Sequence, residues 1–162
     1  MWKKIYCAAL VCLTCVIFTA VAAAQTEDAA KRAEKPARIE LVLVLDKSGS
    51  MQGLEKDTIG GFNAMLEKQK ALAVPVRVTA VLFNDRTDVL YASRSIHSVK
   101  PLTAKEYEVG GTTALLDAVG STILKVEQKE DTKIKGTKVI FVIITDGMEN
   151  ASTEFTKPKV KQ

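Results

Sequence analysis

Five oxygen-bearing side chains in three separate segments are the residues best suited to chemistry in this sequence. Asp46 is followed at alternate positions by Ser48 and Ser50. Thr113 follows a pair of glycines, and Asp146 lies 100 positions after Asp46. If the segment after Asp46 stays extended, its alternate side chains face the same side. Hard oxygen donors with two negative charges suit Mg²⁺ or Mn²⁺ better than Zn²⁺. We therefore predict a divalent-cation site formed by Asp46, Ser48, Ser50, Thr113 and Asp146.

The predicted cation site would be incompletely saturated by this chain. Two carboxylates leave a divalent cation close to neutral, and bound waters would fill part of its coordination shell. A carboxylate from a partner protein could supply the missing oxygen ligand. Thr113 is favoured over Thr112 because of its spacing to the helix that follows.

Hydrophobic patterns predict the elements that must position these residues. Apolar runs predict strands at residues 39–45, 76–83, 89–93 and 138–144, and helical spacing predicts helices at 54–72 and from near residue 113. A turn at 84–87 makes the second and third strands a hairpin. This alternation predicts an α/β, Rossmann-like fold, with a mostly parallel sheet, helices on both faces and one antiparallel edge hairpin. Asp46 and Asp146 each follow a strand, so both should lie at the carboxyl edge of the sheet, where such sheets bind ligands.

Three motifs occur in an order that resembles one protein family. Residues 43–51 (LVLDKSGSM) resemble the first element of the metal-ion-dependent adhesion site of von Willebrand factor type A (vWA) domains. Residues 110–115 (GGTTAL) resemble its threonine element, and residues 143–147 (IITDG) resemble its last acidic element. The resemblance covers roughly residue 39 to the end of the chain. It implies a vWA fold in which Asp46, Ser48, Ser50, Thr113 and Asp146 are the metal residues, some of them acting through water.

The sequence departs from this family after the last motif. The resemblance implies two further strands with their helices, whereas the sequence ends at Gln162. We therefore expect an incomplete vWA fold with strand order 3-2-1-4 and an apolar fourth strand at the edge, which favours self-association. Three explanations stay open: a fragment, a truncated reading frame, or a domain completed by another chain.

The N-terminal residues are typical of an export signal. Lys3 and Lys4 precede an uncharged apolar stretch, and three alanines at 22–24 offer a cleavage site. We predict a signal peptide at 1–24, a linker at 25–38 and a partial vWA-like domain at 39–162, in a periplasmic or secreted protein. The alternative is an uncleaved membrane anchor, since the apolar stretch is long enough to cross a bilayer. All three cysteines lie at 7–15, so a cleaved chain would have no thiol chemistry.

The net charge and the motifs together limit the classes of function that this sequence supports. The formal net charge is +4, and Lys3 and Lys4 account for half of it, so we expect no nucleic-acid partner. We predict an exported, metal-dependent protein-binding module for adhesion or scaffolding, and not an enzyme. One alternative is a non-functional or structural remnant of a vWA domain. A less favoured alternative is a phosphotransferase-type enzyme, which would need a second Asp at the position of Ser48.

Several other residues receive structural interpretations. The glycines at 60–61 should allow close packing of the first helix on the sheet. Lys47 should point to solvent, and Asp117 should stabilise the first turn of the second helix. Glu149 and Asn150 belong either to the rim of the site or to a surface loop.

Overall fold

The computed structural model describes residues 36–161, which belong to one compact unit. The predicted signal peptide at 1–24 and most of the predicted linker at 25–38 lie outside the described residues. Within the described part of the chain, no helix is long and apolar enough to span a membrane.

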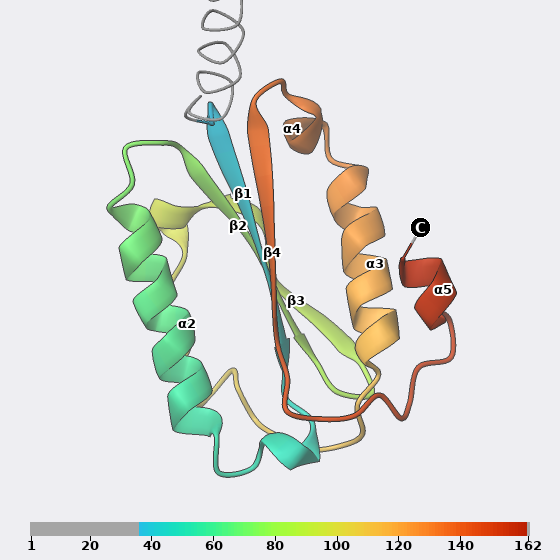
Figure 1. Cartoon of the computed structure of the whole chain (residues 1–162). Helices are drawn as coiled ribbons and strands as arrows, with labels where there is room; N and C mark the ends of the chain where they lie inside the picture. The colour runs from blue at the N-terminus through green and yellow to red at the C-terminus, as the bar shows by residue number, and fades with distance from the viewer. Residues whose placement is uncertain (1–35, 162) are drawn as a thin grey trace, which may run out of the picture. The chain divides into compact units, whose positions relative to one another are not determined.

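The core of the domain is a four-stranded sheet with the order β3-β2-β1-β4 (Figure 1). Its strands are β1 (Arg38–Asp46), β2 (Val76–Phe83), β3 (Thr87–Ser95) and β4 (Thr137–Ile144). β1 runs parallel to β2 and β4, and Leu45 is in register with Leu82 on one side and Ile144 on the other. β3 pairs antiparallel with β2. The carboxyl ends of β1, β2 and β4 therefore meet at one edge of the sheet.

Helices cover both faces of β1, which explains its continuous apolar sequence. Leu41, Leu43 and Leu45 belong to the hydrophobic cluster that includes Phe62 of α2 (Glu55–Lys70). Val42 and Val44 point to the opposite face and pack with Ala118 and Val119 of α3 (Leu115–Glu127). The shorter helices are η1 (Gly49–Met51), η2 (Ile96–Ser98), α4 (Glu130–Lys133) and α5 (Lys157–Val160).

The predicted architecture is confirmed: the sheet is mixed and mostly parallel, with helices on both faces and an antiparallel hairpin at one edge. β4 forms the other edge of this four-stranded sheet, as expected for an incomplete vWA fold. Its burial differs from that of β1, because Val139 and Ile143 remain 44% and 43% exposed. An apolar sequence alone therefore did not identify a fully covered strand.

The expectation for the glycines at 60–61 was wrong. Both are exposed, and a Cβ atom at either position would meet no atom within 4 Å. The close approach occurs instead at Gly120 of α3, where a Cβ atom would lie 2.2 Å from the ring of Phe155. Gly120 therefore accommodates the C-terminal segment on the outer side of α3.

Candidate metal centre

Asp46 is the last residue of β1, and its carboxylate is completely buried. Its Oδ1 accepts a hydrogen bond from the backbone N–H of Ser48 at 2.7 Å, and its Oδ2 accepts one from the hydroxyl of Thr145 at 2.6 Å. These two bonds fix the orientation of the carboxylate. Each oxygen keeps further acceptor capacity for a cation or a water molecule.

Ser48, Ser50 and Asp146 form a continuous polar chain next to Asp46. The hydroxyl oxygens of Ser48 and Ser50 are 3.1 Å apart, and the Ser50 hydroxyl donates to Oδ1 of Asp146 at 2.9 Å. Ser48 is buried, whereas Ser50 and Asp146 are exposed. The site is therefore open to solvent on the side of Asp146.

Thr113 joins the same cluster, as the space beside Gly147 shows. A Cβ atom on Gly147 would lie 3.0 Å from Oγ of Ser50, 3.2 Å from Oγ1 of Thr113 and 3.5 Å from Oδ2 of Asp46. Oxygens from three separate loops thus converge on one small volume. Thr113 is buried and Thr112 is exposed. The structure therefore brings together all five residues that the sequence identified as candidates.

The donor set fits a hard divalent cation. It consists of two carboxylates and three hydroxyls, and oxygen ligands of this kind are those that Mg²⁺ and Mn²⁺ prefer. Among the described residues, no group of three or more His, Cys, Asp or Glu side chains is placed so that it could hold a metal ion, so the three hydroxyls are an essential part of this candidate donor set.

Sequence reasoning missed two residues that hold Asp46 in place. Thr145 occurs within the Thr-Asp-Gly motif, and its hydroxyl both donates to Asp46 and accepts the N–H of Gly147 at 3.2 Å. The buried Tyr107 donates its phenolic hydrogen to the backbone carbonyl of Asp46. Burial raises the pKa of Tyr107, so the phenol remains a donor at neutral pH. The motif could have indicated Thr145, but no sequence pattern singled out Tyr107.

The loops that carry the five residues are hydrogen-bonded to one another. Gly110 N–H donates to the carbonyl of Lys47 at 2.8 Å, and Gly49 N–H donates to the carbonyl of Gly111 at 3.1 Å. Asn84, in the turn between β2 and β3, donates its side-chain amide to the carbonyl of Gly110 at 2.9 Å. The β2–β3 turn therefore supports the loop at residues 110–114, called the threonine loop, a role that the sequence of the turn did not indicate.

The expectation that Lys47 points to solvent was wrong. Its ammonium group lies 2.8 Å from the carboxylate of Asp88 on β3, and its side chain is only 17% exposed. Lys47 therefore forms an ion pair with Asp88, a carboxylate outside the candidate site. A neighbouring cation would otherwise weaken the attraction of the site for Mg²⁺.

Asn150 and Glu149 attach the last loop to the threonine loop and to α3. Thr113 N–H donates to the side-chain oxygen of Asn150 at 2.9 Å, and Asn150 N–H donates to the carbonyl of Thr113 at 3.1 Å. Glu149 accepts the N–H of Leu116, in the first turn of α3, at 2.8 Å. Both side chains therefore position the site from its rim.

Asp117 lies in the first turn of α3, as expected, and its carboxylate also holds a C-terminal segment that the sequence did not indicate. Its carboxylate accepts the N–H groups of Thr153, Glu154 and Phe155 at 2.8–2.9 Å. Burial raises the pKa of Asp117, but these hydrogen bonds outweigh the effect and hold it below its ordinary value of 3.8. Burial and hydrogen bonding likewise oppose each other at Glu149, and the net result is a pKa below 4.5.

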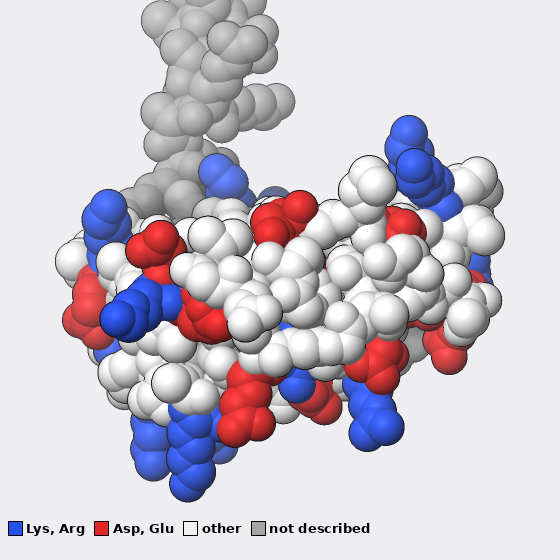
Figure 2. All heavy atoms as spheres, turned by 90° about the horizontal axis from the view of Figure 1, so that it is seen from below, with Lys and Arg blue, Asp and Glu red and all other residues white. Residues whose placement is uncertain are grey.

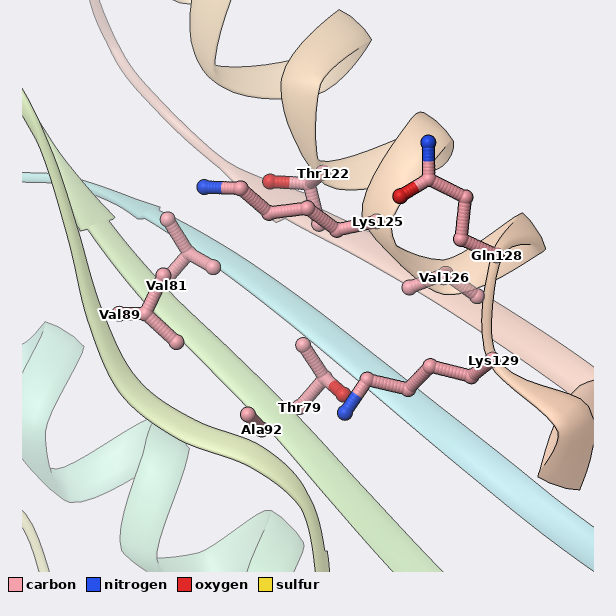
Figure 3. Close-up of a pocket in the computed structure, with 9 residues that line it drawn as sticks. All are labelled: Thr79, Val81, Val89, Ala92, Thr122, Lys125, Val126, Gln128 and Lys129. Atoms are coloured by element: carbon pink, nitrogen blue, oxygen red, sulfur yellow. The ribbon is translucent and has the colours of Figure 1, made fainter.

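A separate hollow of about 340 Å³ lies between the hairpin and the C-terminal half of α3 (Figure 3). Val81, Val89 and Val126 form much of its apolar lining, and the side chains of Lys125 and Lys129 extend over it. None of the five candidate metal residues lines this hollow.

Viewed from the edge where β1 ends, acidic side chains are spread over the surface, and most Lys and Arg side chains project from its rim (Figure 2).

The sheet order and the three converging loops define a vWA-type α/β domain. The chain belongs to the family described as VWA domain containing CoxE-like protein, whose model matches residues 21–162. No curated protein matches the sequence significantly.

Several solved structures are similar to this chain to different degrees. The chain is similar to the ArnB paralog VWA2 from Sulfolobus acidocaldarius, with a TM-score of 0.51 and 22% identity, covering 72% of this chain and 29% of that one. It is also similar to proximal thread matrix protein 1 from the mussel byssus, with a TM-score of 0.45 and 18% identity, covering 75% and 31%. A form of that mussel protein with a zinc-occupied MIDAS motif matches with a TM-score of 0.44 and 14% identity, covering 77% and 38%. This chain therefore spans well under half the length of these proteins.

Proposed function

We propose that this domain is a metal-dependent protein-binding module of an exported protein, acting in adhesion or scaffolding. The observation that carries the proposal is the convergence of oxygens from Asp46, Ser50 and Thr113 beside Gly147. Mg²⁺ or Mn²⁺ is the proposed cation because all five side chains are hard oxygen donors. The exposure of Ser50 and Asp146 supports access to the cation by a carboxylate of a partner protein.

A binding function is proposed in preference to catalysis. Ser48 stands where a phosphotransferase of the strand-Asp type would need its second Asp. The hydroxyl of Ser48 faces another hydroxyl, that of Ser50, at 3.1 Å. The cluster thus supplies ligands for a cation without an adjacent general base of the histidine type.

Metal titration of the purified chain by calorimetry tests the cation site. We expect Asp46→Ala and Asp146→Ala each to abolish Mg²⁺ and Mn²⁺ binding, since one remaining carboxylate compensates poorly for cation dehydration. Ser48→Ala and Ser50→Ala should weaken binding less. Gly147→Ala should weaken it about tenfold or more, a change of about 1.4 kcal/mol, because the added methyl group occupies the converging volume.

Three controls make this titration decisive. Asp46→Asn keeps the shape of the buried side chain and removes its charge, so it separates loss of binding from loss of folding. Asp57→Ala removes an exposed carboxylate from the first turn of α2 and should leave affinity unchanged. Circular dichroism must show native secondary structure for each variant. Equal affinity in the wild type and Asp46→Asn would refute the assignment and favour a structural remnant.

The protein-binding part of the proposal needs its own measurement. A fluorescent glutamate-containing peptide should show higher anisotropy with the chain in Mg²⁺ than in EDTA, because its carboxylate completes the cation shell. Its glutamine counterpart should not bind. If the cation binds but neither peptide responds to it, the metal site stands and carboxylate recognition is refuted.

A further inference from the structure

The end of the domain at which β1, β2 and β4 begin differs in charge from the end that carries the five candidate metal residues, called the metal end. Three segments meet there: the entry to β1, the loop from α2 to β2 and the loop from α4 to β4 (Figure 1). Ala37 N–H donates to the carbonyl of Gly136 at 3.0 Å, and Ile39 N–H donates to the carbonyl of Pro75 at 2.9 Å. These bonds join the three segments into one surface, called here the basic end.

Positive charge is concentrated on the basic end. Residues 68–77 contain two lysines and one arginine, and Lys70 pairs with Glu67 at 2.8 Å. Residues 94–100 adjoin this end because Ser95 is in register with Arg77, and they contain one arginine and one lysine and no acidic residue. Residues 129–138 contain four lysines against two acidic residues. At the opposite end, residues 145–155 contain three acidic residues and no Lys or Arg. The charge of the domain is therefore distributed unequally between the two ends of its sheet.

Two aliphatic side chains protrude from the same surface. Leu72 is 43% exposed in the loop after α2, and Ile134 is 45% exposed in the loop before β4. Lys133 and Lys135 flank Ile134 in the sequence. Leu72 also lines a hollow of about 480 Å³ together with Arg38 and His97. Basic residues beside exposed aliphatic side chains match the surface of an anionic bilayer, with charged headgroups over an apolar interior.

One of the two predictions for the N-terminal residues, the uncleaved anchor, also favours a bilayer as the partner. Residues 5–21 contain no charged side chain, and 13 residues at 25–37 separate residue 24 from β1. Thirteen residues reach at most about 45 Å when fully extended, at about 3.5 Å each. Under the alternative prediction of an uncleaved membrane anchor, a linker of this length would keep the domain within reach of the same bilayer.

We propose that the basic end docks on an anionic lipid bilayer, with Leu72 and Ile134 entering the headgroup region. This inference does not depend on the metal site, which lies at the opposite end of the sheet. Docking in this orientation leaves Asp146 and Ser50 facing away from the bilayer, accessible to a partner protein. A nucleic acid is the less favoured partner because the exposed apolar residues here are aliphatic and offer no ring for base stacking.

The experiment uses the full chain in lipid vesicles with one tryptophan as a depth probe. The sequence contains a single tryptophan, Trp2, which Trp2→Phe removes. Ile134→Trp then places an indole on the basic end, and Met148→Trp places one on the metal end, where Met148 is 86% exposed. Vesicles contain brominated phosphatidylcholine alone or mixed with phosphatidylglycerol, and bromine quenches an indole that enters the bilayer.

We expect the indole at position 134 to be quenched in vesicles with phosphatidylglycerol, and much less in phosphatidylcholine alone or at 1 M salt. The indole at position 148 should be quenched in neither. Each basic residue near an anionic surface strengthens binding about fivefold. Lys135→Gln with Lys138→Gln should therefore shift the docking equilibrium about 25-fold toward the undocked state. Lys56→Gln with Lys105→Gln, two exposed lysines outside the basic end, should not shift it.

Three results would overturn the proposal. Equal quenching at positions 134 and 148 would mean that the N-terminal segment tethers the domain without docking it. Absence of quenching at both positions would mean that the surface does not meet the bilayer. Binding of a DNA oligonucleotide that depends on Lys135 and Lys138, without quenching at position 134, would assign the surface to nucleic acid.

Discussion

Asn84 shows how one residue outside the candidate ligand set supports the site. Its amide holds the carbonyl of Gly110, its side-chain oxygen accepts the N–H of Arg86 at 3.1 Å, and its own carbonyl accepts the N–H of Ala114 at 2.8 Å. The bonds to Gly110 and Ala114 hold the chain on both sides of Thr113. A change at Asn84 should therefore reach the cation through the threonine loop.

We expect Asn84→Ala to weaken Mg²⁺ affinity several-fold and to lower the free energy of unfolding by about 1 kcal/mol, because two side-chain hydrogen bonds are lost. Calorimetry and urea denaturation measure the two effects. Arg86→Ala is the matched control, since Arg86 is exposed and its bond to Asn84 uses only the backbone. Unchanged Mg²⁺ affinity in Asn84→Ala would show that the loop keeps its geometry without the amide.

Acidic pH should loosen the segment that follows Asp146. Asp117 holds three N–H groups of residues 153–155, and its pKa lies below 3.8 in the folded chain. A carboxylate with a lowered pKa stabilises the fold fully above its unfolded pKa, and this contribution disappears as pH falls through the folded value. The wild type should therefore exceed Asp117→Asn in unfolding free energy by about 1 kcal/mol at pH 6, discounted for partial exposure.

Denaturation of both proteins between pH 7 and pH 3 checks this dependence. The difference between wild type and Asp117→Asn should be constant above about pH 5 and shrink below pH 3.8. Asp57→Asn, on the exposed first turn of α2, provides the comparison for a carboxylate on another helix. A difference that does not vary with pH would show that charge on Asp117 is not what holds the segment.

The packing of the C-terminal segment on α3 depends on the contact between Gly120 and Phe155. A Cβ atom at Gly120 would lie 2.2–2.5 Å from three ring atoms of Phe155, so Gly120→Ala must displace the ring. Overpacking of this kind costs about 1–3 kcal/mol. We expect Gly120→Ala to destabilise the chain by that amount and to expose the segment around Phe155 to proteases.

A double-mutant cycle isolates this contact. In a Phe155→Ala background the ring is absent, so Gly120→Ala should be neutral or stabilising, since alanine favours a helix over glycine by about 1 kcal/mol. Gly60→Ala, at an open helical position, should stabilise the chain in either background. Equal destabilisation by Gly120→Ala with and without Phe155 would contradict the steric explanation.

The elements with strong periodicity could be predicted from the sequence, and their connections could not. The strand at 76–83 was predicted with its observed bounds, and α2 and β4 within two residues of theirs. The five candidate site residues could be proposed because a strand-Asp motif and its partner motifs are visible in the sequence, and the structure brings them together. Tyr107 and Asn84 could not, because their roles depend on tertiary contacts across 61 and 26 residues.

At the scale of the whole molecule, β4 has an unpaired edge in the described sheet and two exposed apolar side chains, Val139 and Ile143. Such an edge favours strand pairing between copies. We expect the chain to self-associate at micromolar concentration, and Val139→Lys or Ile143→Lys to reduce this association, as measured by sedimentation velocity.

Val89→Lys is the matched control for this association. Val89 is 43% exposed and lies on β3, the other edge strand, so it offers similar apolar area without the edge of β4. Its substitution should leave the association largely unchanged. A wild-type chain that sediments as a single monomer across this concentration range would contradict the prediction.

The assembly of the candidate site from residues 46–50, 110–113 and 145–147 has a consequence for folding kinetics. No local segment contains the site, because Ser50 and Asp146 are 96 residues apart in sequence and meet only when β4 has paired beside β1. Contacts of such high sequence separation form late and slowly. Cation binding should therefore appear after the sheet closes, and Mg²⁺ should slow unfolding with little effect on the rate of folding.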